Sequence, residues 1–197
     1  MKYLGRDLMD IRSNISKMSS FTGVMDYKKL LQNKENQNQE LCIRAVIQNG
    51  LNLEFIENQN EKICFLAVED NGMALEFVKE QTEIICQQAV ESNGLALQFV
   101  KNPSHQTKYK AVNENGLALQ YIEGSKEIFY HDAVMENGLA LQFVEHQTEE
   151  LCMKAVLSNP RAIEFVENQT EELCLTAVKK DGELLKFVEN QTEEICI

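Results

Sequence analysis

The sequence predicts an all-α fold, specifically an α-solenoid of tandem helix–turn–helix repeats that are each 22 residues long. Three markers predict it, because an Ala-Val pair, an Asn-Gly pair and one aromatic residue return at this spacing without insertion or deletion. The Ala-Val pairs begin at Ala45, Ala67, Ala89, Ala111, Ala133, Ala155 and Ala177. Since every unit must then fit the same kind of neighbour, the units are expected to stack in a row.

The other two markers keep the same register. The second marker reads Asn-Gly in most units, Asn159-Pro160 in the sixth and Asp181-Gly182 in the seventh. The aromatic residues are Phe55, Phe77, Phe99, Tyr121, Phe143, Phe165 and Phe187. Each unit is therefore expected to contain the same two helices with the same two boundaries.

Residues 82–92 predict the first helix of a typical unit. Their apolar side chains form a single stripe, with the spacing i, i+1, i+4 and i+5, at Ile85, Cys86, Ala89 and Val90. Thr82 is a suitable N-cap, and acidic residues in the first turn suit the helix dipole. Gly94 is expected to stop the helix by adopting the left-handed conformation. Residues 95–101 predict a second, shorter helix.

The helix-breaking residues support these boundaries. Pro160 stands where other units have Gly, so it should end the first helix at Asn159 and begin the second helix in its first turn. Pro103 and Gly124 lie at the other boundary, between successive units. From Gly50 onward every Gly and Pro lies at one of these two boundaries, which favours a helix–turn–helix unit.

An alternative is a leucine-rich-repeat-like α/β solenoid, whose period is also about 22 residues. Residues 97–102 would then form its short strand and Asn turn. A row of small residues favours the helical pair instead, since it suits close helix packing: Ala74, Ala96, Ala118, Ala140 and Ala162. The Asn that the turn requires is also replaced, at Glu80, Gly124 and His146.

The repeat pattern TEEICxxAVxxNGLALQFVENQ resembles the short tandem repeat of an uncharacterised family, the domain of unknown function numbered 4116. Repeats of that family occur in proteins of giant DNA viruses, some bacteria and protists. The resemblance covers the chain from about Gln39 to its end. It implies a helical repeat and brings no activity, because the family has none assigned.

The two ends of the chain depart from the regular pattern. Residues 1–38 are expected to form an N-terminal helix followed by a degenerate capping repeat. The apolar residues of that helix are Leu4, Leu8, Ile11 and Ile15. Residues 39–197 hold the tandem repeats, and the last of these is incomplete because it stops inside its first helix. This end suggests a truncated chain or a longer parent protein.

Composition narrows the class of partner and the cellular location. The formal net charge is −12, and binding to a phosphate backbone needs clustered Lys and Arg, so we expect no nucleic-acid partner. No apolar stretch reaches the length of a signal peptide or a membrane span. The expected location is cytoplasmic, or inside a host cell if the protein is viral.

The cysteines all occupy one repeat position, three residues before the Ala of the Ala-Val pair: Cys42, Cys64, Cys86, Cys152, Cys174 and Cys196. Equivalent positions in packed helices lie about 10 Å apart, whereas a disulfide needs Cα atoms within about 7 Å. The thiols are therefore expected to be reduced, buried core residues. Lys108 and Tyr130 fill the two places where Cys is missing.

No enzyme or cofactor motif occurs in the sequence. It has no CxxC or HExxH pattern, no glycine-rich phosphate loop, and no His placed for a zinc site or a Ser/His/Asp triad. Acidic pairs such as Glu149-Glu150 are explained as charges in the first turn of a helix. We therefore expect no catalytic activity, no metal and no cofactor.

A row of equivalent positions in a solenoid forms a continuous surface, and such surfaces commonly bind proteins. Lys108, Tyr109, Tyr130 and His131 interrupt the Cys ladder and form the candidate patch for a protein partner. The alternative is neutral variation in two middle units. The expected function is a non-enzymatic helical-repeat scaffold. Two alternatives are a recognition arm of a larger enzyme or effector, and self-association through an end face.

Overall fold

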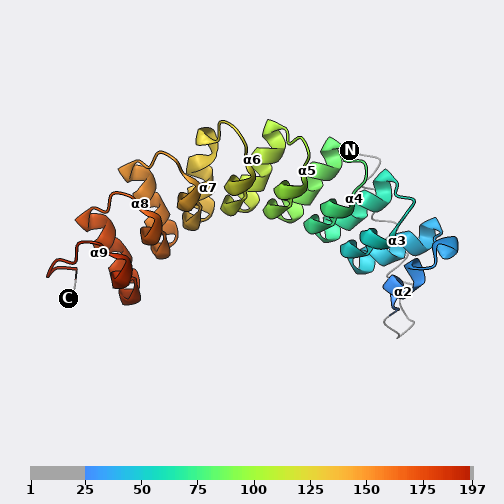
Figure 1. Ribbon diagram of the computed structural model, residues 1–197, viewed down its shortest axis with the longest axis horizontal. Helices are drawn as coiled ribbons and strands as arrows, with labels where there is room; N and C mark the ends of the chain where they lie inside the picture. Colours follow the sequence, from blue (N-terminus) through green and yellow to red (C-terminus); the bar gives the residue numbers. More distant parts are fainter. Residues whose placement is uncertain (1–24, 196–197) are drawn as a thin grey trace.

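The computed structural model describes residues 25–195, and this range holds α-helices, 3₁₀ helices and loops without a β-strand (Figure 1). The all-α, repeat-built class is confirmed. The leucine-rich-repeat alternative is wrong, because residues 97–99 lie in a 3₁₀ helix and not in a strand. The helix predicted around Leu4 and Ile15 lies outside the described residues, as does Cys196 at the other end.

The α-helices and the 3₁₀ helices, labelled η, alternate along most of the chain. Their order is α2 (Tyr27–Leu31), η1 (Lys34–Asn36), α3 (Gln39–Gln48), η2 (Gly50–Phe55), α4 (Glu61–Asp70), η3 (Gly72–Phe77), α5 (Glu83–Ser92), η4 (Gly94–Phe99), α6 (His105–Glu114), η5 (Gly116–Tyr121), η6 (Glu127–Phe129), α7 (Tyr130–Glu136), η7 (Gly138–Phe143), α8 (Glu149–Ser158), η8 (Pro160–Phe165), α9 (Glu171–Lys180) and η9 (Gly182–Phe187). The second helix of each unit is thus a 3₁₀ helix. We name each unit after its α-helix.

One Asn joins the two helices of a unit. In the α5 unit the Asn93 N–H donates to the Ala89 carbonyl at 2.9 Å, which closes the α-helix. The Asn93 side-chain oxygen accepts from the Leu95 N–H at 3.0 Å, which caps the 3₁₀ helix. Its extended backbone, with φ −155°, turns the chain between the two. Pro160 begins η8 directly after Asn159, as the sequence predicted.

The Gly after this Asn has a different role from the one expected. Among the described residues only Gly124 has a positive φ, so the expectation of a left-handed Gly94 is wrong. Gly94 is buried, and a Cβ there would overlap the carbonyl oxygen of Ala111 and lie 2.9 Å from the backbone N of Asn115. The Gly therefore permits a close approach between the second helix of one unit and the α-helix of the next.

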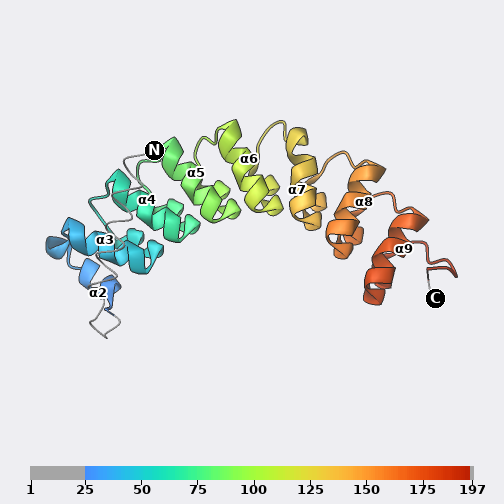
Figure 2. The same ribbon diagram turned by 180° about the vertical axis from the view of Figure 1, so that it is seen from behind.

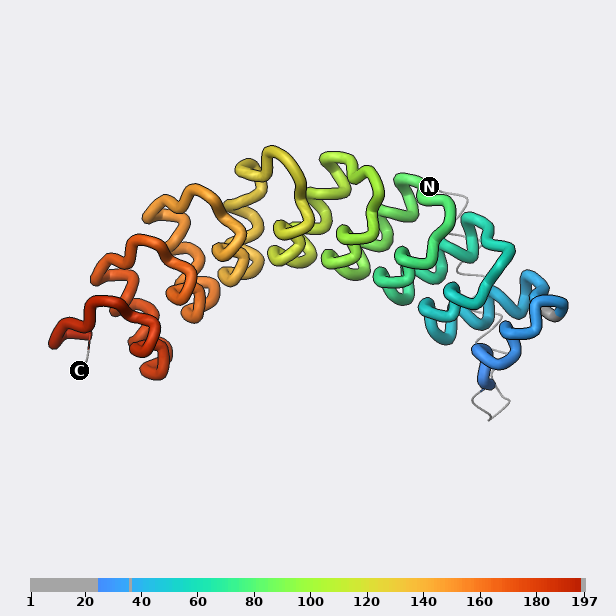
Figure 3. The backbone as a smooth tube through the Cα atoms, viewed as in Figure 1, coloured from blue at the N-terminus to red at the C-terminus, as the bar shows by residue number. Residues whose placement is uncertain are grey.

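The units lie side by side in a curved arch, with α2 at one end and α9 at the other (Figures 1 and 2). The extensive contacts between elements join neighbouring units, such as α4 with α5 and η3 with η4. The tube in Figure 3 repeats the same path in each unit, and the loops between units follow the convex edge of the arch. The arch is therefore built by repeating the same contact between neighbouring units.

The core is one continuous row of buried residues that passes through all these units. The Ala of every Ala-Val pair is completely buried, which lets adjacent α-helices pack closely. The five described cysteines are buried free thiols, as predicted. Burial raises the pKa of the Cys64 and Cys86 thiols to about 11, because desolvation disfavours the thiolate.

Candidate functional site

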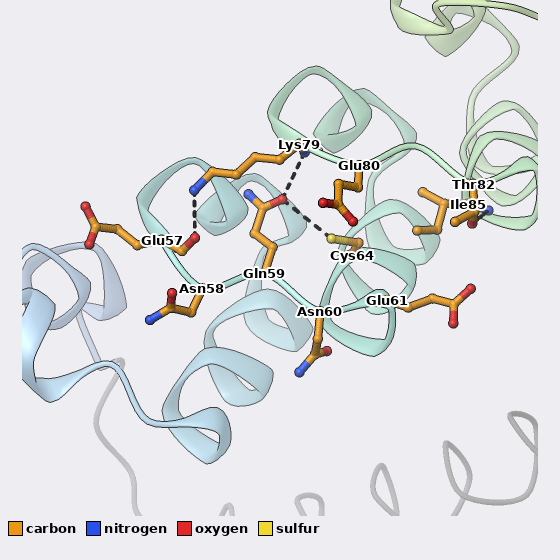
Figure 4. A pocket seen from close by; sticks show the side chains of 10 residues that line it. All are labelled: Glu57, Asn58, Gln59, Asn60, Glu61, Cys64, Lys79, Glu80, Thr82 and Ile85. Carbon is orange, nitrogen blue, oxygen red and sulfur yellow. Dashed lines mark hydrogen bonds between the residues drawn. The ribbon is translucent and has the colours of Figure 1, made fainter.

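A glutamine side chain links consecutive loops along the convex edge. In the α4 unit the Gln59 Nε2 donates to the Phe77 carbonyl at 2.8 Å. Its Oε1 accepts from the Lys79 N–H at 3.1 Å, as Figure 4 shows. The Cys64 thiol donates to the same Oε1 at 3.6 Å. We call this arrangement the glutamine clamp. It holds the loop before an α-helix to the loop that follows the 3₁₀ helix of the same unit.

The clamp recurs with nearly constant geometry. It is formed by Gln37, Gln59, Gln81, Gln147 and Gln169, each bonded to an aromatic residue's carbonyl and to the N–H two residues later. The donor–acceptor distances lie between 2.7 and 3.1 Å. Since backbone groups between loops would otherwise need water, the clamp pairs them within the protein.

Sequence reasoning missed the clamp, although the sequence carries a signal for it. Gln and Cys stand five residues apart in the regular units, and the two units that lack Cys also lack this Gln. Pro103 takes its place before Lys108, and Ser125 takes its place before Tyr130. The joint loss follows from their contact, because the thiol donates to the Gln oxygen in four of the units.

The α6 and α7 units, which lack the clamp Gln, differ in what bonds to the backbone groups that a clamp would hold. In the α7 unit the Tyr130 hydroxyl accepts from the Glu145 N–H at 3.3 Å, so it replaces the oxygen of the missing Gln. In the α6 unit no such replacement occurs among the described residues. There the Tyr121 carbonyl and the Glu123 N–H, which are equivalent to the groups held by a clamp, have no partner within residues 25–195.

The structure divides the patch that the sequence predicted. Tyr109 and His131 are exposed on the outer face of α6 and α7, and Lys108 is half-buried. Tyr130 is buried, with 6% of its surface exposed, so its inclusion in an exposed patch is wrong. The physical reason is that its hydroxyl accepts a hydrogen bond from the Glu145 N–H in the loop after η7.

A polar cluster connects α5 with α6 beside this patch. The Glu83 carboxylate accepts from the Ser104 hydroxyl at 2.6 Å, from Gln87 Nε2 at 2.7 Å and from the Thr107 hydroxyl at 2.9 Å. The Ser104 hydrogen bond, followed by that from Gln87, holds the pKa of Glu83 below its ordinary value. Lys110 pairs with Glu91 across the same two helices. Thr107 is completely buried, at a repeat position that holds Ile, Leu or Phe in the other units.

Large apolar side chains remain exposed on the same side of the neighbouring helices. The exposed fractions are 46% for Tyr109, 64% for Ile128, 52% for Met135 and 53% for Leu157. Tyr109 and His131 share one repeat position, Met135 and Leu157 share another that lies four residues further along the helix, and Ile128 lies in η6 just before α7. The Ser158 hydroxyl donates to the Met135 carbonyl at 3.3 Å, which places α7 and α8 together at this surface. We call these five residues the α6–α8 patch.

The hollows between loops are small and have a mixed lining of polar and apolar groups. One of about 260 Å³ surrounds the clamp of the α4 unit and is lined by Glu57, Glu61, Glu80 and Lys79 among others (Figure 4). Within the described residues, no group of three or more His, Cys, Asp or Glu side chains is placed to hold a metal ion. No helix of this part of the chain is long and apolar enough to cross a bilayer.

Comparison with known proteins does not place the chain in a family. Searches of family models, of curated proteins and of solved structures found no match. The family resemblance of the repeat therefore stays a prediction.

The buried thiols should react slowly in the folded protein. At pH 8 we expect a thiol reagent to label Cys64 and Cys86 about a hundredfold more slowly than in urea, because their raised pKa leaves little thiolate. Mass spectrometry of a Cys196→Ser variant would follow the labelling without the last cysteine. Equal rates with and without urea would contradict this prediction.

Proposed function

We propose that this protein is a non-enzymatic scaffold that binds another protein through its repeat surface. The observation that carries the proposal is the α6–α8 patch, where Tyr109, Ile128, Met135 and Leu157 are each about half exposed or more. Scattered exposed apolar residues are ordinary, but a group of them on adjacent helices is typical of a protein-binding surface. The proposed location is inside the cell.

The rest of the surface supports a protein partner. The net charge of −12 repels nucleic acid. Tyr and Met are among the residue types enriched in protein interfaces, and the patch contains both. Two of the three units that carry the patch, α6 and α7, are those in which the clamp departs from its usual form, so the middle of the arch differs from both flanks.

The test is a variant that keeps the fold and changes only the patch. Tyr109→Ser, Met135→Ser and Leu157→Ser combined should abolish capture of the partner in crosslinking and mass spectrometry, with little change in melting temperature, because all three side chains are exposed. Leu51→Ser in η2 is the matched control, since Leu51 is an exposed apolar residue away from the patch. Capture of the same partners by the triple variant would contradict the proposal.

A further inference from the structure

The α6 unit contains an open position in the row of clamps. Pro103 stands where other units have the clamp Gln, and a Pro side chain has no group for hydrogen bonding. As a result, the Tyr121 carbonyl and the Glu123 N–H lack a partner among the described residues. This pair of backbone groups belongs to a half-buried residue, Tyr121, and to an exposed residue, Glu123. We call it the amide gap.

The equivalent units show which chemical group fits this gap. In each clamp a primary carboxamide donates to one carbonyl and accepts from the N–H two residues later, as in Gln81 with Phe99 and Lys101. This is the pattern by which an extended strand pairs with a neighbour. The five clamps all use a Gln side chain, so the complementary ligand group is the side-chain amide of Gln or Asn.

The charge around the amide gap indicates the rest of the ligand. Lys108 stands where the clamp's Cys would be, five residues after Pro103, and no hydrogen bond or ion pair with the described residues engages its ammonium group. Lys101 is exposed on the adjacent loop. Nearby Lys126 and Lys110 are already paired, with Glu145 at 3.2 Å and with Glu91. Two free cations in a strongly acidic protein favour a negatively charged ligand.

We propose that the amide gap binds an extended acidic peptide segment that carries a Gln or Asn. The amide donates to the Tyr121 carbonyl and accepts from the Glu123 N–H, and flanking Asp or Glu side chains pair with Lys108 and Lys101. The inference rests on the proposed function, since the segment belongs to the protein partner. It adds a chemical requirement that the α6–α8 patch alone does not impose.

The direct test uses synthetic peptides of about nine residues, a length that crosses several loops. One peptide has a central Gln between Asp and Glu residues, a second replaces this Gln with Leu, and a third replaces the acidic residues with Lys. We expect the first to shift the ¹⁵N-NMR signal of the Glu123 amide and to bind about tenfold more tightly than the others. An unchanged Glu123 signal, or equal binding of all three, would overturn the inference.

A filled variant provides the matched control. Pro103→Gln with Lys108→Cys rebuilds the clamp, so we expect it to melt at a higher temperature and to lose peptide binding. Lys108→Ala alone leaves the gap open and should weaken binding in a salt-dependent way. Peptide binding that survives in the filled variant would sink the inference. If the whole partner still requires the α6–α8 patch but not the gap, only this inference fails, whereas the proposed function fails if the patch is dispensable.

Discussion

Replacing Gly94 with Ala is expected to destabilise the protein by about 3 kcal/mol, which is the upper part of the range for overpacked cores. The added Cβ would overlap the Ala111 carbonyl oxygen and approach the Asn115 backbone N to 2.9 Å. Neither group is the flexible end of a side chain, so the α6 unit has to move away from the α5 unit. Urea denaturation followed by circular dichroism would measure the loss.

Gly182→Ala is the control, because the same substitution there has nothing within 4 Å of the new Cβ. Its backbone φ is not in the left-handed region, so Ala is tolerated and should stabilise the protein by about 0.5 kcal/mol through the unfolded chain. The two variants share one change in sequence and differ only in the neighbouring unit. Equal effects of both would show that close packing between units is not the reason for this Gly.

Replacing Gln81 with Glu should destabilise the protein by about 2 kcal/mol at pH 7, the typical penalty for an acceptor that loses its donor. The carboxylate keeps the shape of the amide and can still accept from the Lys101 N–H, but it cannot donate to the Phe99 carbonyl. Gln106→Glu is the control, since Gln106 is exposed in the first turn of α6, where a negative charge suits the helix dipole.

The loss caused by Gln81→Glu should depend on pH with a defined sign. The Phe99 carbonyl disfavours the charged carboxylate, so the folded state raises the pKa of the new Glu. Protonation then restores a donor, so the stability difference from the wild type should shrink as the pH falls through the raised pKa of the folded state, and should be smallest below about 4, near the ordinary pKa of Glu. A difference that stays constant between neutral and acidic pH would exclude the missing donor as its cause.

The sequence was sufficient to predict the repeat, its helical class and the Asn turn between the two helices, because these depend on interactions within one unit. The second helix, expected to reach residue 101, ends at Phe99. The Asn at the end of each α-helix and Pro160 at the start of η8 are local signals that mark the same boundaries in the structure. The predicted role of Gly94 was wrong, because its actual role depends on the Ala111 carbonyl of another unit. The 3₁₀ geometry of the second helix has no distinct signal in apolar spacing over so few residues.

The candidate site was only partly predictable. Tyr109 and His131 were correctly identified as surface residues, since their repeat position varies and lies beside the buried stripe. Tyr130 was misplaced because its hydroxyl substitutes for a Gln oxygen, and this exchange is visible only when the Glu145 N–H is known to lie nearby. The clamp itself was accessible from the sequence, through the shared absence of Gln and Cys in two units.

Because the extensive contacts between units join only neighbours, the arch is held together by a single series of junctions. A force applied at its two ends loads every junction in series, so the weakest junction opens first. Each unit pulled free would lengthen the chain by about 65 Å, because its 22 residues extend to about 75 Å and neighbouring units are already about 10 Å apart. Such a protein would lengthen in equal steps, as an extensible tether does.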